Sequence, residues 1–390
     1  MRVLSLIARG LGTLLIWALI LLLLAITIVP AFLDRHYYEG PASGHFNGAR
    51  FFNPDGDPIP GLSGPRGGVL TRFIPGGVMR PPWPRTVAVR PIDPRRLAPL
   101  RAGEMRVIWI GHATVLIQTP GLNILTDPIW SDVAGPFGIG PHRVMAPGVA
   151  FEALPRIDLV VVSHNHYDHL DLPTLERLWR RDRPVIVTGL GNDRLMATRG
   201  ISAHGLDWGQ ALRLRGATVH VARSHHWSSR WFADRDRALW SSFVIETPAG
   251  NIFFAGDTGP GDMRWPREAR RWGPIRLALL PIGAFRFVPG QMVNGAHIGP
   301  REAVDVFQKL GAASAIPLHW GTFRLSAEAW GTPVALLRLF ENCRGVDPRR
   351  FAGVRPGVPV TVPSTPAPMV PPRLPASACR NDSPEVTAYP

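Results

Sequence analysis

The segment Ser163–Asp171 reads SHNHYDHLD and places three histidines and an aspartate within six positions. Imidazole nitrogens and carboxylate oxygens are the ligands that Zn²⁺ and similar divalent ions prefer in proteins. The chain has only 13 histidines in 390 residues, so a histidine-rich solvated loop is the weaker explanation. We therefore predict a metal site that includes His164, His166, Asp168 and His169.

The flanking residues predict that these ligands lie on a loop between a strand and a helix. Ile157–Val162 is an apolar, β-branched run, which is typical of a buried strand. Asp171, followed by a leucine, a proline and the pattern TLERLW, indicates a helix start with a capping acid. A loop lets backbone turns bring together side chains that a strand would direct to opposite faces.

Further candidate ligands follow two predicted strand segments later in the chain. Residues 217–223 alternate like a half-buried strand and lead into His225 and His226. Residues 241–255 predict a hairpin that ends just before Asp257.

The ends of two more predicted strand segments carry polar residues of the same kind. Residues 313–318 form an apolar run that ends at His319. An earlier predicted hairpin, residues 107–126, contains His112 and is followed by Asp127.

The HxHxDH spacing after an apolar strand resembles the metallo-β-lactamase superfamily. A set of finer motifs over roughly residues 106–330 is similar to the N-acylphosphatidylethanolamine-hydrolysing phospholipase D family: GHATVL, LTDPI, SHNHYDHLD, LDW, HWSSR, FAGDTG, PIGAF and HWGTF. The resemblance implies an α/β fold, the αββα four-layer sandwich.

The resemblance also implies a site with two Zn²⁺ ions. One ion would be held by His164, His166 and His226. The other would be held by Asp168, His169 and His319. Asp257 would bridge the two ions, and the predicted catalytic residues are Asp168 and Asp257. Such a pair of cations activates water and stabilises charge on phosphoryl oxygens. The implied reaction is hydrolysis of N-acylphosphatidylethanolamine to phosphatidic acid and an N-acylethanolamine.

Four residues receive supporting roles in this scheme. The resemblance implies that Asp127 supports the ligands from behind, and His112 is expected to do the same or to be a core histidine. Tyr167 and His297 are expected to contact substrate, although Tyr167 could simply pack and His297 could cap a helix. His225 competes with its neighbour for the ligand position.

A lipid substrate also requires an apolar rim with cationic groups near the site. The candidates, each of which could instead belong to the core, are Trp227, Trp231, Phe232, Phe285, Phe287 and Trp320, with Arg230 and Arg286. The metal ligands alone leave two alternatives open: a zinc-dependent lactonase or amidase, and a zinc nuclease.

The net charge of +14 favours an anionic partner. A lipid surface is expected, because no basic cluster is interleaved with aromatic residues as in a groove for nucleic-acid strands. Genomic arginine bias would produce the same charge.

Residues 11–33 carry no charge and, at about 33 Å as a helix, are long enough to span a bilayer. They predict a retained single-pass anchor, with cleavage after Ala31 as the alternative. Arg2 and Arg9 favour a cytoplasmic N-terminus and a periplasmic catalytic domain, whereas Arg35 and Arg50 oppose it.

The composition divides the chain into four parts: an anchor (1–33), a Gly/Pro/Arg-rich connector (34–100), a hydrolase domain (101–344) and a Pro-rich, disordered tail (345–390). Pro300–Leu310 predicts a helix that Gly311 ends. Cys343 and Cys379 could form a bridge in an oxidising compartment.

Overall fold

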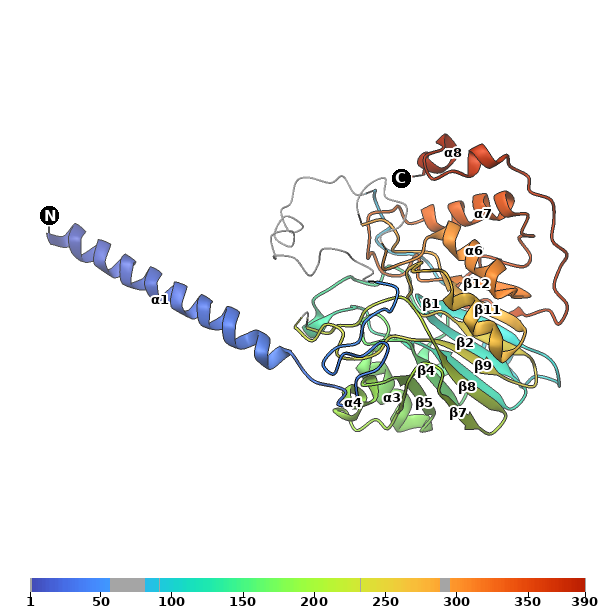
Figure 1. The fold of residues 1–390 in the computed structure, drawn as a ribbon, viewed down its shortest axis with the longest axis horizontal. Helices are drawn as coiled ribbons and strands as arrows, with labels where there is room; N and C mark the ends of the chain where they lie inside the picture. Colours follow the sequence, from blue (N-terminus) through green and yellow to red (C-terminus); the bar gives the residue numbers. More distant parts are fainter. Residues whose placement is uncertain (1, 57–80, 91, 232, 288–294, 390) are drawn as a thin grey trace.

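The computed structural model describes residues 2–56, 81–90, 92–231, 233–287 and 295–389. Two mixed β-sheets face each other, and helices cover their outer faces (Figure 1). The predicted αββα sandwich is confirmed.

The first sheet has the strand order β13-β1-β2-β3-β4-β5-β6. Its strands are β1 (Arg106–Gly111), β2 (Thr114–Thr119), β3 (Leu122–Thr126), β4 (Leu159–Val162), β5 (Val185–Gly189), β6 (His204–Leu206) and β13 (Val360–Thr361). The neighbours from β3 to β6 are parallel, so their carboxyl ends share one edge. The predicted hairpin over 107–126 is a three-stranded antiparallel meander, because the chain turns twice, before β2 and before β3.

The second sheet has the order β12-β11-β10-β9-β8-β7. Its strands are β7 (Ala211–Leu214), β8 (Ala217–Ala222), β9 (Ser242–Glu246), β10 (Asn251–Phe254), β11 (Ile275–Pro281) and β12 (Ser314–Leu318). The predicted hairpin is β9 and β10, which pair antiparallel with Phe253 opposite Val244. Strands β10, β11 and β12 are parallel, so the segments after β10 and β12 leave from one edge.

Helices cover both sheets, and a continuous apolar core lies between the sheets. The helices are α3 (Leu172–Asp182), α4 (Asn192–Ala197), α5 (Trp265–Ala269), α6 (Pro300–Leu310), α7 (Thr332–Arg344) and α8 (Pro384–Thr387), with short 3-10 turns at Pro94–Leu97, Pro136–Gly138, Phe151–Ala153, Arg270–Trp272 and Ala376–Cys379. The helix predicted before Gly311 has the predicted bounds, and Gly311 caps it with a φ of 63° that favours glycine. Buried residues of both sheets, such as Trp109 and Phe243, form the central core. Each such side chain contributes about 1.5–3 kcal/mol on burial.

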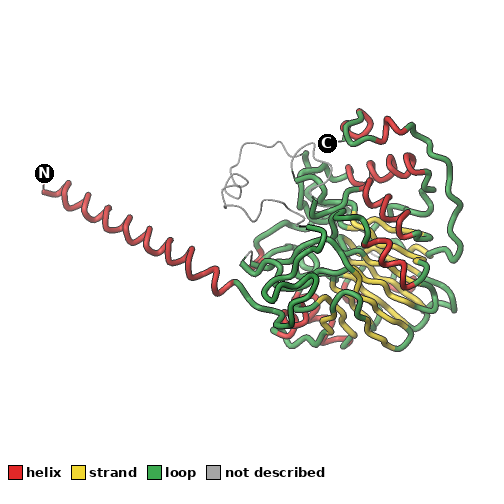
Figure 2. The backbone as a smooth tube through the Cα atoms, in the orientation of Figure 1, coloured by secondary structure: helices red, strands yellow, loops and turns green. Residues whose placement is uncertain are grey.

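An apolar helix, α1 (Arg2–Leu33), extends away from this domain (Figures 1 and 2). Its segment Arg9–Val29 has 21 residues, a mean hydropathy of 2.8 and no buried share. The helix is therefore long and apolar enough to cross a membrane.

The described part of the connector packs against the domain more closely than its composition indicates. Phe46 and Phe51 are buried against Leu239 and Trp240. The carboxylate of Asp34 also pairs with Arg237 at 2.7 Å. Residues of the connector before position 57 therefore contribute to the core.

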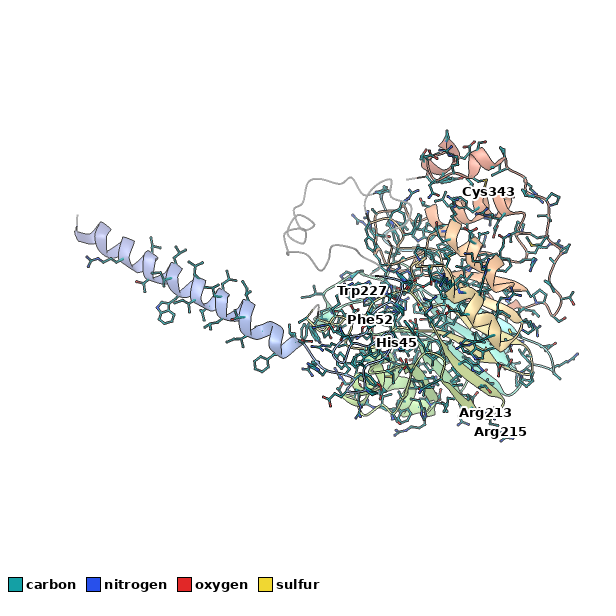
Figure 3. All side chains as sticks on the ribbon, in the orientation of Figure 1. His45, Phe52, Arg213, Arg215, Trp227 and Cys343 are labelled. Carbon is teal, nitrogen blue, oxygen red and sulfur yellow. A yellow bond between two sulfur atoms is a disulfide. The ribbon has the colours of Figure 1, made fainter. Side chains whose placement is uncertain are left out.

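The predicted disorder of the tail is wrong for residues 345–389. Val360–Thr361 pair with β1, and Phe351, Val362 and Val386 are buried. Cys343 and Cys379 form a disulfide, which holds the tail against α7 on the side of the domain away from α1 (Figure 3). Apolar residues spaced between the prolines give this segment enough burial to order it, which a count of prolines does not detect.

Candidate metal centre

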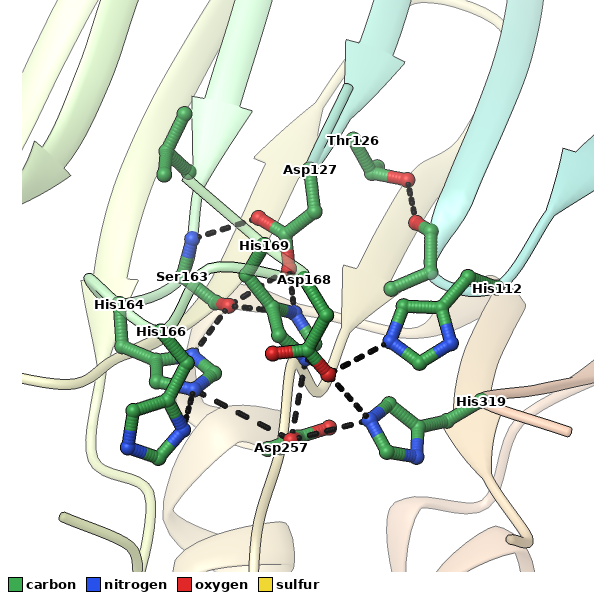
Figure 4. A network of polar contacts seen from close by, with 12 residues as sticks. His112, Thr126, Asp127, Ser163, His164, His166, Asp168, His169, Asp257 and His319 are labelled. Carbon is green, nitrogen blue, oxygen red and sulfur yellow. Dashed lines mark hydrogen bonds and ion pairs between the residues drawn. The ribbon is translucent and has the colours of Figure 1, made fainter. Parts of the chain in front are cut away.

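Loops that follow strands of both sheets converge on one buried cluster of histidines and aspartates (Figure 4). The loop after β4 carries SHNHYDHLD, as predicted. Asp171 occupies the N-cap position of α3, but its carboxylate accepts hydrogen bonds from Ser131 and Thr174 rather than from a helix amide. That network ties the end of the ligand loop to the neighbouring loop after β3.

The first group of possible ligands contains His164, His166, His226 and Asp257, whose ligand atoms all lie within 4.8 Å of one another. His164 Nε2 is 2.7 Å from His166 Nδ1, and His226 Nε2 is 3.4 Å from the same nitrogen. The Oδ2 atom of Asp257 is 4.0 Å from His164 Nε2 and 3.9 Å from His226 Nε2. The structure thus brings together the residues that the resemblance assigns to one ion, with the proposed bridging aspartate beside them.

The second group contains Asp168, His169 and His319. His112 also belongs to it, because the ligand atoms of all four residues lie within 4.8 Å of one another. The Oδ2 atom of Asp257 lies 3.0 Å from His169 Nε2 and 3.1 Å from His319 Nε2. Asp257 therefore touches both groups, which is the position that a bridging carboxylate requires. Its other oxygen, Oδ1, is buried without a hydrogen-bond partner among the described residues.

Asp127 and His112 hold two of these side chains in place. Asp127 is fully buried, and its Oδ2 lies 2.6 Å from His169 Nδ1. Ser163 donates from its backbone amide and its hydroxyl to the same carboxylate, at 2.7 and 2.6 Å. His112 Nε2 lies 2.9 Å from Asp168 Oδ2. The contact with Asp127 leaves His169 Nε2 directed toward the centre, and the contact with His112 orients the Asp168 carboxylate.

Two residues of the connector contact the histidine pair that follows β8, and the sequence analysis predicted neither contact. Asn53 donates from its amide to the backbone carbonyl of His226 at 2.8 Å. Asp55 lies 3.0 Å from His225 Nδ1, which turns that histidine away from the cluster. His226 is therefore the member of the pair in the ligand position, as the resemblance implied.

Burial and mutual charge give these groups different proton affinities. Burial keeps the pKa of His164 and of His226 well below the usual histidine value and lowers the pKa of His166 to about 3. Burial also opposes the charged form of His319, but nearby carboxylates, Asp257 first, outweigh it and raise the pKa of His319 to about 9. The first group thus offers neutral nitrogens, whereas a cation in the second must displace protons.

The donor set fits divalent metal ions. Nitrogens and carboxylate oxygens converge in a buried space, and the close approach of His164 Nε2 to His166 Nδ1 at 2.7 Å needs a shared proton or cation between two lone pairs. The unpartnered Oδ1 of Asp257 adds an acceptor that a cation would satisfy.

His297 and Tyr167 occupy different places around the cluster. His297 Nδ1 lies 3.9 Å from Asp257 Oδ2, and burial lowers its pKa to about 4. The cap of α6 is Gly299, so His297 does not cap that helix. Tyr167 lies beneath Arg230, whose guanidinium carbon is 3.6 Å from the ring centre, and both line a cavity of ≈520 Å³.

The predicted rim is only partly at the surface. The ring centres of Trp227 and His166 are 4.2 Å apart, and the Phe287 side chain is 44% exposed. Phe285 is buried, and Trp320 stacks on Trp109 within the core. Trp231 and Arg230 line the cavity. Arg286 is buried and donates to the Tyr389 carbonyl. Phe232 lies outside the described residues.

Comparison with known proteins agrees with this geometry. The sequence profile described as the beta-lactamase superfamily domain matches residues 122–320, just over half of the chain. The chain is 34% identical over 227 residues to N-acyl-phosphatidylethanolamine-hydrolyzing phospholipase D 1 of Caenorhabditis elegans, covering 55% of this chain and 63% of that protein. It is 33% identical over 251 residues to the mitochondrial N-acyl-phosphatidylethanolamine-hydrolyzing phospholipase D of Saccharomyces cerevisiae, covering 62% of this chain and 53% of that protein.

The match covers less than two thirds of the length of these curated relatives. Among solved structures, the metallo hydrolase Igni18 of Ignicoccus hospitalis superposes with a TM-score of 0.50 at 20% identity, over 66% of this chain and 98% of that chain, which supports the fold. The chain belongs to the metallo-β-lactamase superfamily.

Proposed function

We propose that the protein is a membrane-anchored phosphodiesterase of phospholipase D type with two Zn²⁺ ions. Its substrate would be N-acylphosphatidylethanolamine, and its products phosphatidic acid and an N-acylethanolamine. The observation that carries the proposal is the pair of ligand groups that meet at Asp257, in a chain similar to two phospholipases of that name.

His164, His166 and His226 would hold one ion, and Asp168, His169 and His319 the other, with Asp257 between them. Bound cations of this kind lower the pKa of water and stabilise the charge that develops on phosphoryl oxygens. The protein's own contribution is orientation: Asp127 fixes His169, and His112 fixes Asp168. His297, whose Nδ1 lies 3.9 Å from Asp257 Oδ2, would contact a bound diester.

The helix α1 would tether this centre to its lipid substrate in a bilayer, with the catalytic domain on the periplasmic side. The net charge of +14 supports an anionic lipid surface as the partner. The Cys343–Cys379 disulfide supports an oxidising compartment, since such bonds are rare in the cytosol.

The substrate class is tested by incubating the purified full-length protein with N-acylphosphatidylethanolamine, an acyl lactone and a β-lactam, each with added zinc and with a chelator. We expect metal-dependent release of phosphatidic acid at a rate at least about 100-fold above lactone opening, a difference of about 2.7 kcal/mol in transition-state binding. Efficient lactone opening without phosphatidic acid would instead identify a lactonase of the same fold.

A further inference from the structure

The loop between Gly135 and Gly140 presents two apolar side chains to solvent. Phe137 is 88% exposed and Ile139 is 74% exposed, more than any other large apolar side chain described outside α1. The loop is tightly closed, because a Cβ at Gly135 would collide with the Ile139 carbonyl oxygen. Phe137 has a φ of 54°, a left-handed conformation that few residues other than glycine adopt. Exposed apolar residues on a strained, closed loop indicate a contact surface.

This loop lies beside the point where α1 meets the domain. Arg35 and Tyr37, which follow α1, line the same ≈520 Å³ cavity as Phe137, Trp231 and Arg199. Figure 1 shows α1 leaving the domain at one end. If α1 crosses a bilayer, Arg35 lies close to the membrane-proximal end of α1, because the two residues after Leu33 span no more than about 7 Å. The residues that share a cavity with Arg35 lie on the same side of the domain.

Contacts after α1 fix the junction of the helix to the domain. Asp34 pairs with Arg237 at 2.7 Å and with Arg50 at 3.1 Å. The Tyr37 hydroxyl donates to Asp234 Oδ2 at 2.9 Å, and Asp234 also accepts from the backbone amide of Trp231. The junction is therefore bonded to the loop that carries Trp231, so this face keeps its place next to the membrane.

The charge of the cavity favours an anionic headgroup. Three arginines line it, Arg35, Arg199 and Arg230, against Asp132 and Asp171. The Asp171 carboxylate already accepts hydrogen bonds from Ser131 and Thr174. Arg35 and Arg199 are exposed, whereas Arg230 is half-buried and donates to the backbone carbonyls of Asn165 and Leu170. An apolar loop beside exposed arginines is the combination by which proteins bind the interface of an anionic bilayer.

Aromatic side chains connect this surface with the metal centre. The Phe137 and Trp231 rings are 5.8 Å apart, and the Trp231 and Tyr167 rings are 6.3 Å apart. Tyr167 lies in sequence between His166 and Asp168. We propose that residues 135–140 insert into an anionic phospholipid bilayer as a second attachment besides α1, and that the cavity behind them receives a headgroup of that bilayer. This inference rests on the membrane association in the proposed function but not on the reaction.

Insertion is tested with full-length protein reconstituted in vesicles of phosphatidylglycerol and phosphatidylcholine with brominated acyl chains. An Ile139→Cys variant carries an environment-sensitive fluorophore, and the native cysteines do not compete because they form a disulfide. The control is Arg215→Cys, an exposed position that Figure 3 places at an edge of the domain away from α1. We expect brominated lipid to quench position 139 about twofold and to leave position 215 unchanged. Equal signals at the two positions, quenched or unquenched, would overturn the inference.

A paired functional measurement separates this inference from the proposed reaction. The Phe137→Ser/Ile139→Ser double variant should lose about tenfold in turnover of vesicle lipid while keeping turnover of a short, soluble phosphodiester. The matched control, Met369→Ser, removes an apolar side chain that is 48% exposed and should change neither rate. Vesicle turnover unchanged in the double variant would contradict the inference. Quenching at position 139 in a protein that cleaves no phosphodiester would support the membrane contact and refute the reaction.

Discussion

Replacing Asp127 by asparagine should weaken metal binding at the second ligand group without unfolding the protein. The Asp127 carboxylate accepts from the Ser163 amide through Oδ1 and from the Ser163 hydroxyl through Oδ2, which also lies 2.6 Å from His169 Nδ1. An asparagine that keeps its oxygen toward the Ser163 amide turns its NH₂ group toward His169. His169 must then carry its proton on Nε2, the nitrogen 3.0 Å from Asp257.

A proton on Nε2 removes the lone pair that a cation would use. The opposite orientation of the asparagine leaves two buried donors facing each other at Ser163, which costs about 1–3 kcal/mol. The ion can therefore bind only after the asparagine adopts the less favourable orientation. The affinity for one of the two ions should fall by about 10- to 100-fold, equivalent to about 1.4–2.8 kcal/mol. The ion held by His164, His166 and His226 should keep its affinity within about threefold, since Asp127 touches none of these side chains.

The assay is a competition titration of metal-free protein with zinc and a chromogenic chelator, with metal content measured by mass spectrometry. Asp158→Asn is the matched control: its carboxylate accepts from the Asn123 amide at 2.9 Å in the same sheet, away from the centre. The control should bind both ions as the unaltered protein does. Two unchanged affinities in Asp127→Asn would refute the argument that Asp127 selects the His169 tautomer.

Three further predictions follow from the same structure. Asp257→Asn should lower metal content at both ligand groups, whereas His226→Ala should chiefly affect one, and mass spectrometry of the purified variants distinguishes the two patterns. His297→Ala should reduce lipid turnover by about 100-fold while metal content stays near that of the unaltered protein, which parallel assays would show. Burial raises the pKa of Glu341 from 4.5 to about 8, so its contribution to stability is complete below about pH 4.5 and is lost as the pH rises through about 8. Relative to Glu341→Gln, the free energy of unfolding should therefore fall by about 3 kcal/mol between about pH 5.5 and 8.5, and a pH-independent difference in denaturant titrations would contradict this.

The ligands were predictable from the sequence because each follows a strand of strongly apolar or alternating character. Parallel strands then bring the segments after β10 and β12, with Asp257 and His319, to one edge of the second sheet. Local pattern thus defines both the residue types and their approximate meeting place. Both His225 and His226 follow β8, so the pattern alone could not decide which of them is the ligand, and only the family resemblance favoured His226. In the structure, His225 instead contacts Asp55.

The contributions of the connector and tail depend on contacts distant in sequence. Asn53 lies 173 positions from His226, whose carbonyl it holds, and no local pattern marks that contact. The same holds for Arg286, which looked like a headgroup ligand next to Phe285 but donates to the carbonyl of Tyr389. The sequence of an arginine-containing loop does not show whether the guanidinium contacts a substrate or donates to a buried backbone carbonyl.

The proposed reaction predicts where an oxygen atom from water ends. In phospholipase D hydrolysis, water attacks phosphorus, and the bond to the ethanolamide oxygen breaks, so the water oxygen joins the phosphate and the N-acylethanolamine keeps its own oxygen. The most direct measurement is therefore mass spectrometry of the products formed by the full-length, zinc-loaded protein from N-acylphosphatidylethanolamine in ¹⁸O-labelled water. We expect one ¹⁸O in phosphatidic acid and none in the N-acylethanolamine. Label in a released fatty acid, or no phosphatidic acid from protein that holds both metals, would contradict the account.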